Sequence, residues 1–180
     1  AWYAAQREAD AVAVRQGEDV LTWAELDRRS NRRAHAFAAH GVKAGDFVAI
    51  GLPNSLAYFE VTFAVWKLGA TIAPIPSRLP AGEARGLLDL LRPTLLVGGD
   101  PDWGDWPRIA VEADLDAWPD TGFAAPISRH WAVISSGGST GCPKLIVQHM
   151  MAVTGNTYRV LAGLGPGQRI LNPGAPMHHT

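Results

Sequence analysis

Hydrophobic and polar positions along the chain follow two alternating patterns: short apolar runs typical of strands, and longer segments of helical period. The strand-like runs cover residues 11–15, 20–21, 46–52, 71–75, 94–97 and 131–134. The helix-like segments cover residues 22–40, 55–68 and 80–91. Strands that alternate with helices of about ten or more residues indicate βαβ units. The pattern therefore predicts an α/β fold with a mainly parallel sheet and flanking helices.

The first two helices begin at residues with capping chemistry. Thr22, followed three residues later by Glu25, forms a capping box in which each side chain bonds the backbone N–H of the other residue. Gly41 is well placed to end this helix, and Asn54 or Ser55 can cap the next one. One narrow face of the first helix is predicted to comprise Leu26, Ser30, Ala34 and Phe37.

The first helix also carries a cluster of four arginines, Arg28, Arg29, Arg32 and Arg33. Such a cluster could bind phosphate or nucleic acid. Glu25 and Asp27 share the same segment, so a solvated helix face with mixed charge is the favoured interpretation. The second helix is apolar nearly all round, which predicts that it is buried between layers.

The pattern breaks over residues 98–128, where four prolines and three tryptophans mark an irregular connection. The tryptophans could line a binding surface. More commonly such residues pin a long loop onto the body of the domain, and this is the interpretation we favour for Trp103, Trp106 and Trp118. Beyond the strand at 131–134, the pattern predicts a return strand over 144–149, a helix over 151–161 and a short strand over 169–171.

Composition narrows the class of protein. The 180 residues carry a formal net charge of −1, which gives no electrostatic case for nucleic acid or an anionic membrane. The single cysteine excludes an internal disulfide and fits a reducing, cytoplasmic setting. The most continuous apolar region, residues 61–76, is interrupted by Lys67, Pro74 and Pro76, so no membrane span is predicted. The chain begins without Met and stops straight after Pro-Met-His-His, so we expect it to be part of a longer protein.

The segment 135–144, with sequence SSGGSTGCPK, carries the clearest chemistry. Glycines let backbone N–H groups approach an anion, hydroxyls donate further hydrogen bonds, and Lys144 adds a positive charge. This composition suits a polyphosphate. The segment is not a Walker A loop, because Cys142 and Pro143 separate Gly141 from the lysine and Leu145 stands where Ser or Thr would hold magnesium. The alternative is a Gly/Ser-rich surface turn.

Four segments together resemble the acyl-adenylate-forming superfamily of AMP-dependent synthetases and ligases. Residues 136–144 resemble its signature loop, 21–26 (LTWAEL) its early LTYxEL box, 66–70 (WKLGA) its xKxGA segment, and 176–180 (PMHHT) its PxxHxxG segment. They occur in the family's order across nearly the whole chain. The resemblance implies that residues 1–180 are the first part of the family's large N-terminal domain.

The resemblance also implies a reaction. A carboxylate attacks the α-phosphate of Mg·ATP to give an acyl-adenylate and pyrophosphate, and coenzyme A or another thiol then displaces AMP. The transition state spreads negative charge over phosphate oxygens, so such a loop acts by positioning and electrostatic stabilisation. The residues implied to bind ATP are Ser136, Gly137, Gly138, Ser139, Thr140, Gly141 and Lys144. Lys144 and His179 are the implied catalytic residues, the latter between the acyl site and the α-phosphate.

Other roles for these residues are weaker. His179 could instead be an ordinary pocket-wall or core histidine. A zinc site built on His178 and His179 is disfavoured, because adjacent residues of an extended segment point to opposite sides, and no metal site is predicted. Cys142 as a nucleophile is also disfavoured, because no recognisable motif places a base beside it.

Two residues in or next to the loop depart from the family pattern, and several of the family's later segments are missing. Gly137 stands where serine is frequent, and Leu145 replaces the usual glycine. The loop together with PMHH looks more like bacterial CoA ligases of the bile-acid/steroid and fatty-acyl type than like amino-acid-activating domains, which suggests fatty acid metabolism. The family's YGxTE segment, ribose-binding aspartate, hinge and small C-terminal domain are missing from these residues. The chain alone is therefore expected to be inactive.

The leading hypothesis is thus an acid–thiol ligase that uses ATP, Mg²⁺ and coenzyme A on a small carboxylic acid. One alternative is an adenylation domain that loads a carrier protein. Another is a non-catalytic nucleotide-binding fragment. The acid, the acceptor thiol and the oligomeric state, with a homodimer as one option, are left open by the sequence.

Overall fold

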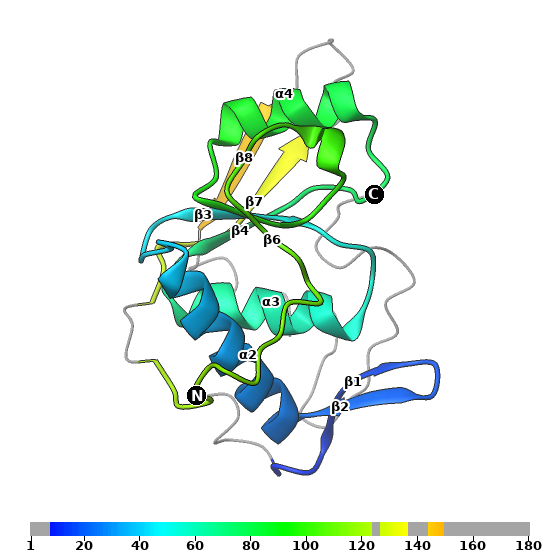
Figure 1. Cartoon of the computed structure of the whole chain (residues 1–180), viewed down its shortest axis with the longest axis vertical. Coiled ribbons are helices and arrows are strands. Elements are labelled where there is room, and N and C mark those ends of the chain that lie inside the picture. Colours follow the sequence, from blue (N-terminus) through cyan, green and yellow to red (C-terminus); the bar gives the residue numbers. More distant parts are fainter. Residues whose placement is uncertain (1–7, 124–126, 137–143, 150–180) are drawn as a thin grey trace.

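A six-stranded sheet forms the centre of the computed structural model, which describes residues 8–123, 127–136 and 144–149 (Figure 1). Its strands are β3 (Phe47–Gly51), β4 (Thr71–Pro74), β5 (Leu95–Gly98), β6 (Arg108–Ile109), β7 (His130–Ser136) and β8 (Lys144–His149). The spatial order is β6-β5-β3-β4-β7-β8. Every neighbouring pair is parallel except β7 and β8, which are antiparallel. The predicted α/β fold with a mainly parallel sheet is confirmed.

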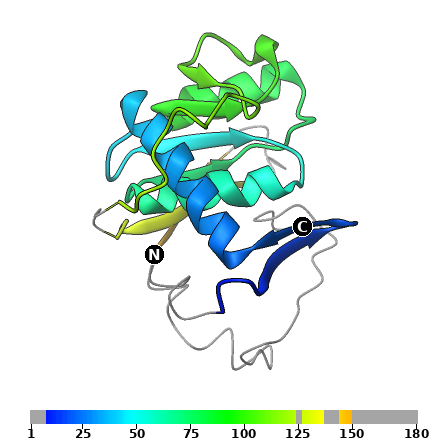
Figure 2. The same cartoon turned by 60° about the horizontal axis from the view of Figure 1, so that its bottom comes forward.

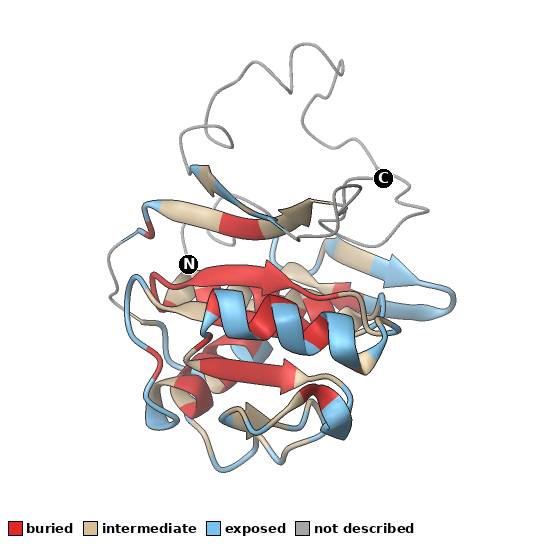
Figure 3. Cartoon of the chain, turned by 90° about the horizontal axis from the view of Figure 1, so that it is seen from above, coloured by how far each residue is buried: buried red, intermediate tan, exposed pale blue. Residues whose placement is uncertain are grey.

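Helices cover both faces of this sheet (Figure 1), and its central strands are buried (Figure 3). They are α2 (Trp23–Ala39), α3 (Leu56–Lys67) and α4 (Ala81–Leu91), with a 3₁₀ turn η1 (Pro101–Trp103). Strand β3 shows why two layers form, because its successive side chains point to opposite faces. Val48 and Ile50 pack with α2 and α3, whereas Ala49 packs with α4 and Trp103. A strand buried on both faces reads as a continuous apolar run, as the sequence indicated.

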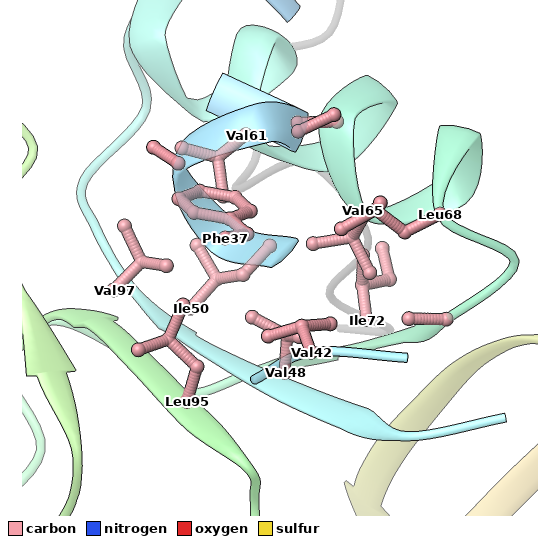
Figure 4. Close-up of a cluster of buried hydrophobic side chains, with 14 of the residues drawn as sticks. Phe37, Val42, Val48, Ile50, Val61, Val65, Leu68, Ile72, Leu95 and Val97 are labelled. Carbon is pink, nitrogen blue, oxygen red and sulfur yellow. The ribbon is translucent and has the colours of Figure 1, made fainter. Parts of the chain in front are cut away.

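The larger of the two cores lies between the sheet and the α2–α3 layer (Figure 4). Phe37 of α2 and Val61 and Val65 of α3 meet Ile50 and Ile72 of the sheet there, all fully buried. No residue of α3 is exposed. The prediction that this helix is buried between layers is confirmed, since it packs on the sheet on one side and on α2 on the other.

The predicted helix starts are also confirmed. Thr22 caps α2: its hydroxyl accepts from the Glu25 N–H at 3.2 Å, and Glu25 accepts from the Thr22 N–H at 2.9 Å. Ser55 caps α3, where its hydroxyl accepts from the Tyr58 N–H at 3.1 Å. Gly41 follows α2 with φ of +91°, a conformation that favours glycine. The predicted inner face of α2 is buried at Leu26, Ser30, Ala34 and Phe37.

The predicted solvated arginine face is wrong for Arg33. This side chain is only 8% exposed, and its Nη2 lies 2.8 Å from a carboxylate oxygen of Glu60 on α3. Arg29 reaches the other oxygen of Glu60 at 3.3 Å. A buried charge requires a partner. The partner of Arg33 is Glu60, which lies 27 positions later in the sequence and on another helix. The periodicity of α2 alone therefore could not show it.

Residues 98–123 run largely without regular structure and are held by their aromatic side chains. Trp103 is 1% exposed in the core under α4, and Trp106 packs against the same core. Trp118 packs against the core under α2 and α3. The prediction that these tryptophans pin the connection is confirmed. The two-residue strand β6 within it was not predicted, because two residues carry no periodicity.

A separate two-stranded hairpin, β1 (Val12–Gln16) and β2 (Asp19–Thr22), precedes α2 and lies apart from the main sheet (Figure 2). Its turn contains Gly17 at φ of +60°. Within the three described ranges, no helix is long and apolar enough to cross a membrane. The predicted helix over 151–161 and strand over 169–171 lie outside the described residues.

Candidate functional site

The predicted phosphate-binding segment lies between strands β7 and β8. Ser136, the last residue of β7, pairs directly with Lys144, the first residue of β8, and Ser135 pairs with Leu145. Ser135 and Ser136 therefore belong to the strand and not to the loop that the sequence assigned to them. The reason is that β8 supplies an antiparallel ladder out to this pair, and ladder pairing overrides the turn preference of serine.

Of the predicted site residues, the structure places Ser136 and Lys144. Residues directly opposite each other on an antiparallel pair project from the same face, with Cβ atoms about 5 Å apart. The Ser136 hydroxyl and the Lys144 ammonium group are thus brought to one face of the hairpin. The other predicted residues lie outside the described residues: Gly137, Gly138, Ser139, Thr140, Gly141 and His179. Cys142 and His178 lie outside them as well.

The strand alternation shows which face this is. Ala132, two strand periods before Ser136, belongs to the core under α2 and α3. Val133 and Leu145 pack against the opposite core, under α4. Ser136 and Lys144 therefore project on the side of the sheet that α3 covers. Lys144 is exposed and forms no ion pair with any residue of the described ranges, so its charge is available to an anion.

The site lies at the carboxyl edge of the sheet. Strand β7 runs parallel to β4, so its carboxyl end, Ser136, points to the same edge as the ends of β3, β4 and β5. The chain leaves β3 through α3 on one face and leaves β4 through α4 on the other face. Ligands of open α/β sheets bind outside the carboxyl ends of strands at such a reversal. The β7–β8 tip lies next to this reversal, because β7 is the neighbour of β4 in the sheet.

At the neighbouring part of this edge, the ends of β3 and β5 pack closely against each other and against Trp103. Trp103 lies against the backbone at Gly51 and Gly99: a Cβ built on Gly51 would lie 2.7 Å from the Gly99 Cα and 2.7 Å from the Trp103 ring. A side chain at Gly51 would not fit here, but a cavity of about 360 Å³ opens beside these strand ends, with Leu52, Gly98 and Arg108 in its lining.

The base of the hairpin is tied to the sheet and to α3. The indole Nε1–H of Trp66 donates to the backbone oxygen of Trp131 at 2.8 Å, and the Thr71 hydroxyl donates to the backbone oxygen of His130 at 3.1 Å. Sequence reasoning did not find these anchors. The WKLGA segment could have indicated one of them, since Trp66, which anchors the hairpin, is its first residue.

Lys67, the second residue of that segment, does not contribute to the hairpin face. Its Nζ donates to Asp27 Oδ1 at 2.7 Å, to the Asp27 backbone oxygen at 2.8 Å and to Asn31 Oδ1 at 2.6 Å. Burial lowers the pKa of Lys67 against the opposing effect of Asp27. Burial also acts to raise the pKa of Asp27, but the hydrogen bond and charge of Lys67 outweigh it and the pKa is lowered. This lysine joins α3 to α2.

Metal-binding chemistry is absent from the part of the chain that the structure describes: no group of three or more His, Cys, Asp or Glu side chains is close enough to hold an ion. His178 and His179, the residues considered for zinc, lie outside the described residues, so the prediction that they hold no metal stays a prediction. His130 and His149 are paired across β7 and β8 with ring centroids 5.4 Å apart, and no third such side chain of the described ranges completes a site with them.

Comparison with known proteins decides the family. The model of the AMP-binding enzyme family matches residues 1–180, the whole chain. The chain belongs to the AMP-binding enzyme family. This family is the acyl-adenylate-forming superfamily indicated by the signature segments, and its members activate carboxylic acids as acyl-adenylates.

Sequence relatives of this AMP-binding chain fall into two groups. Feruloyl-CoA synthase from Amycolatopsis sp is 44% identical over 187 residues, covering 98% of this chain and 38% of that protein. Phosphinothricin tripeptide synthetase PhsC from Streptomyces viridochromogenes is 33% identical over 158 residues, covering 81% of this chain and 14% of that protein. The chain thus spans well under half the length of these relatives.

Solved structures support the fold of this AMP-binding chain. It superposes on o-succinylbenzoate coenzyme A synthetase from Bacillus subtilis, in complex with its acyl-adenylate intermediate, with a TM-score of 0.79. The identity is 23%, over 91% of this chain and 45% of that one. The N-terminal subdomain of NpsA from Klebsiella oxytoca gives a TM-score of 0.70 at 23% identity, over 81% and 39% of the two chains. At this identity the likeness concerns the fold.

Proposed function

We propose that this chain is the ATP-phosphate-binding part of an acid–thiol ligase that forms an acyl-adenylate and then a thioester with coenzyme A. The observation that carries the proposal is the cross-strand pairing of Ser136 with Lys144 at the carboxyl edge of the sheet. Residues 1–180 would then be the first part of the adenylate-forming domain. The segments that complete the active site would belong to the remainder of the enzyme.

The geometry fits a polyphosphate. The Lys144 ammonium group can neutralise one phosphate charge while the Ser136 hydroxyl donates to a phosphate oxygen from the same face. Five further residues of the signature loop, between the two strand ends, are proposed to surround the phosphates with N–H groups and hydroxyls: Gly137, Gly138, Ser139, Thr140 and Gly141. ATP would supply the electrophilic α-phosphate and the pyrophosphate leaving group.

Catalysis by these residues would be electrostatic. Lys144 would stabilise the charge that develops on the phosphate oxygens as the carboxylate attacks. His179 is proposed to lie between the acyl group and the α-phosphate. Mg²⁺ is proposed to bind together with the ATP phosphates, because no group of three or more His, Cys, Asp or Glu side chains among the described residues could hold the ion alone. The proposed setting is cytoplasmic, with a small carboxylic acid as substrate.

Coenzyme A is proposed as the acceptor because the feruloyl-CoA synthase relative is more similar than the peptide synthetase and covers more of the chain. The similarity to the peptide synthetase favours a second candidate, transfer of the acyl group to a carrier protein. Ferulic acid is the natural first substrate to assay, with medium-chain fatty acids beside it. Thioester formed with free coenzyme A would support the first candidate; adenylate formed without such transfer would support the second.

The phosphate role of Lys144 is tested by measuring ATP binding to the purified protein. Lys144→Ala should weaken ATP binding by about tenfold or more, since it removes a charge-assisted contact. Lys43→Ala is the matched control, because Lys43 is exposed and lies on the loop before β3, away from the hairpin. Equal ATP affinity in the two variants would refute the proposed role of Lys144.

The dependence on further residues has its own test. The 180-residue chain is expected to bind ATP but to show no ATP–pyrophosphate exchange with any acid. Robust exchange by the chain alone would contradict this part of the proposal.

A further inference from the structure

A cleft separate from the β7–β8 tip is lined by residues of α2, α3 and the connection that contains Leu115. It has a volume of about 630 Å³. We call it the arginine cleft, and it is lined by Arg28, Arg29, Arg32 and Arg33 of α2, Leu56 of α3 and Leu115 of the following connection. The proposed adenylation chemistry makes no use of this cleft.

The charges of the arginine cleft are unbalanced. Two carboxylates, Glu60 and Asp116, line it beside the four arginines, so two positive charges remain. Glu60 is shared by Arg33 and Arg29. Asp116 pairs with Arg32, but its side chain is 87% exposed, so solvent screens it and the pairing is weak.

Arg28 and Arg32 are the two arginines with unused capacity. Arg28 forms no hydrogen bond or ion pair with any described residue. The Nε–H of Arg32 is buried and has no hydrogen-bond partner among them. The two residues are four positions apart on α2, which places them side by side on the helix surface, and like charges at this spacing destabilise a helix. An anion between the two guanidinium groups would offset this repulsion.

The shape and lining indicate what kind of anion fits. Guanidinium groups present parallel N–H donors that match phosphate oxygens. The cleft volume falls in the range of sites for small organic molecules, about 300–1,000 Å³. It is much larger than the volume that a phosphate ion alone would fill. Leu56 and Leu115 add apolar surface to the lining. We propose that the arginine cleft binds a phosphorylated small organic molecule, its phosphate between Arg28 and Arg32 and its organic part against Leu56 and Leu115.

Phenyl phosphate is a suitable probe, because it carries one phosphate and one apolar ring. Isothermal titration calorimetry should show binding to the protein, and a thermal melt should show a higher Tm in its presence. The double variant Arg28→Gln, Arg32→Gln should bind about tenfold or more weakly. A matched control, Arg15→Gln with Arg129→Gln, removes two exposed arginines that do not line the cleft and should bind as the unmodified protein does.

Two further measurements distinguish the cleft from the proposed ATP site and from a purely structural role of its arginines. Lys144→Ala should leave phenyl phosphate binding unchanged, because Lys144 lies on the hairpin and not in the cleft. The double cleft variant should melt, without phosphate, at the same temperature as the unmodified protein or higher, because a like-charge pair is removed. A lower Tm would show that the arginines are structural and would overturn the proposal.

The remaining outcomes are equally decisive. No binding of phenyl phosphate at millimolar concentration, equal weakening in the control double variant, or loss of binding in Lys144→Ala would each overturn the proposal. Inorganic phosphate should bind more weakly than phenyl phosphate, because it leaves the apolar surface of Leu56 and Leu115 uncovered. Equal affinity for the two would overturn the assignment to an organic phosphate.

Discussion

Replacing Lys67 by methionine should destabilise the protein substantially, although the residue belongs to a segment that first suggested a functional family. Lys67 is 10% exposed, and its Nζ makes three hydrogen bonds, at 2.6, 2.7 and 2.8 Å, to groups of Asp27 and Asn31 on α2. Methionine keeps most of the unbranched apolar stem. The variant therefore removes the charge and the bonds while largely preserving the packing.

The magnitude follows from the exposure of the partner. Hydrogen bonds to charged groups contribute about 1.5–3 kcal/mol each, but three bonds on one nitrogen are not additive. Breaking a fully buried ion pair costs about 3–5 kcal/mol. Asp27 keeps 31% of its side-chain surface in contact with solvent, so water can replace part of what it loses. We expect Lys67→Met to lower the free energy of unfolding by about 2–3 kcal/mol.

Urea denaturation followed by tryptophan fluorescence measures this loss. Lys43→Met is the matched control: Lys43 is exposed, and its change should stay within about 0.5 kcal/mol. A Lys67→Met variant that unfolds at the same urea concentration as Lys43→Met would refute the reasoning. In that case the network would add nothing beyond the packing of the stem.

The same network predicts a pH dependence. The pKa of Asp27 is lower in the folded protein than in the unfolded chain, where it is close to about 3.9. A group of this kind contributes stability above its unfolded pKa, and the contribution disappears as the pH falls through the lower folded pKa. Stability should therefore decline below about pH 4, and Asp27→Asn should show a shallower decline in urea titrations. An unchanged slope in the variant would contradict this.

Two further changes test the fold at single atoms. Gly51→Ala should destabilise the protein by about 1–3 kcal/mol, because the new Cβ would lie 2.7 Å from the Gly99 backbone. Gly86→Ala, at an exposed position of α4 with open space around it, should stabilise the protein by about 0.5–1 kcal/mol. Equal shifts of Tm in the two variants would disprove the close approach at Gly51. Thr22→Ala should cost about 0.5–2 kcal/mol through loss of the capping box, and Thr22→Ser should restore most of it in the same melts.

Local chemistry explains why much of the fold could be predicted from the sequence. The capping box at Thr22 and the cap at Ser55 are contained within a few residues. The β3 run is buried on both faces, and such a run reads directly as a central strand. Each of these features depends on neighbours along the chain, so the sequence is sufficient to find it.

Features made by distant residues could not be predicted in the same way. Arg33 was expected in solvent because its partner, Glu60, lies on another helix. The sequence could not show that Ser136 is a strand residue, since that follows from pairing with Lys144 across the loop. The same pairing brings together two predicted site residues, whereas the predicted phosphate contacts of 137–141 and the role of His179 stay predictions.

The attachment of the β7–β8 hairpin has a mechanical consequence. The hairpin strands pair with each other at six positions, whereas β7 pairs with β4 only at Ala132, opposite Ile72. The Trp66 and Thr71 anchors grip the same end, the base. The ladder within the hairpin is therefore much more extensive than its backbone pairing to β4. Near the tip that carries Ser136 and Lys144, the attachment to the sheet then comes from the packing of Leu145 against the core under α4, so a change at Leu145 would loosen the tip before it disturbed the base.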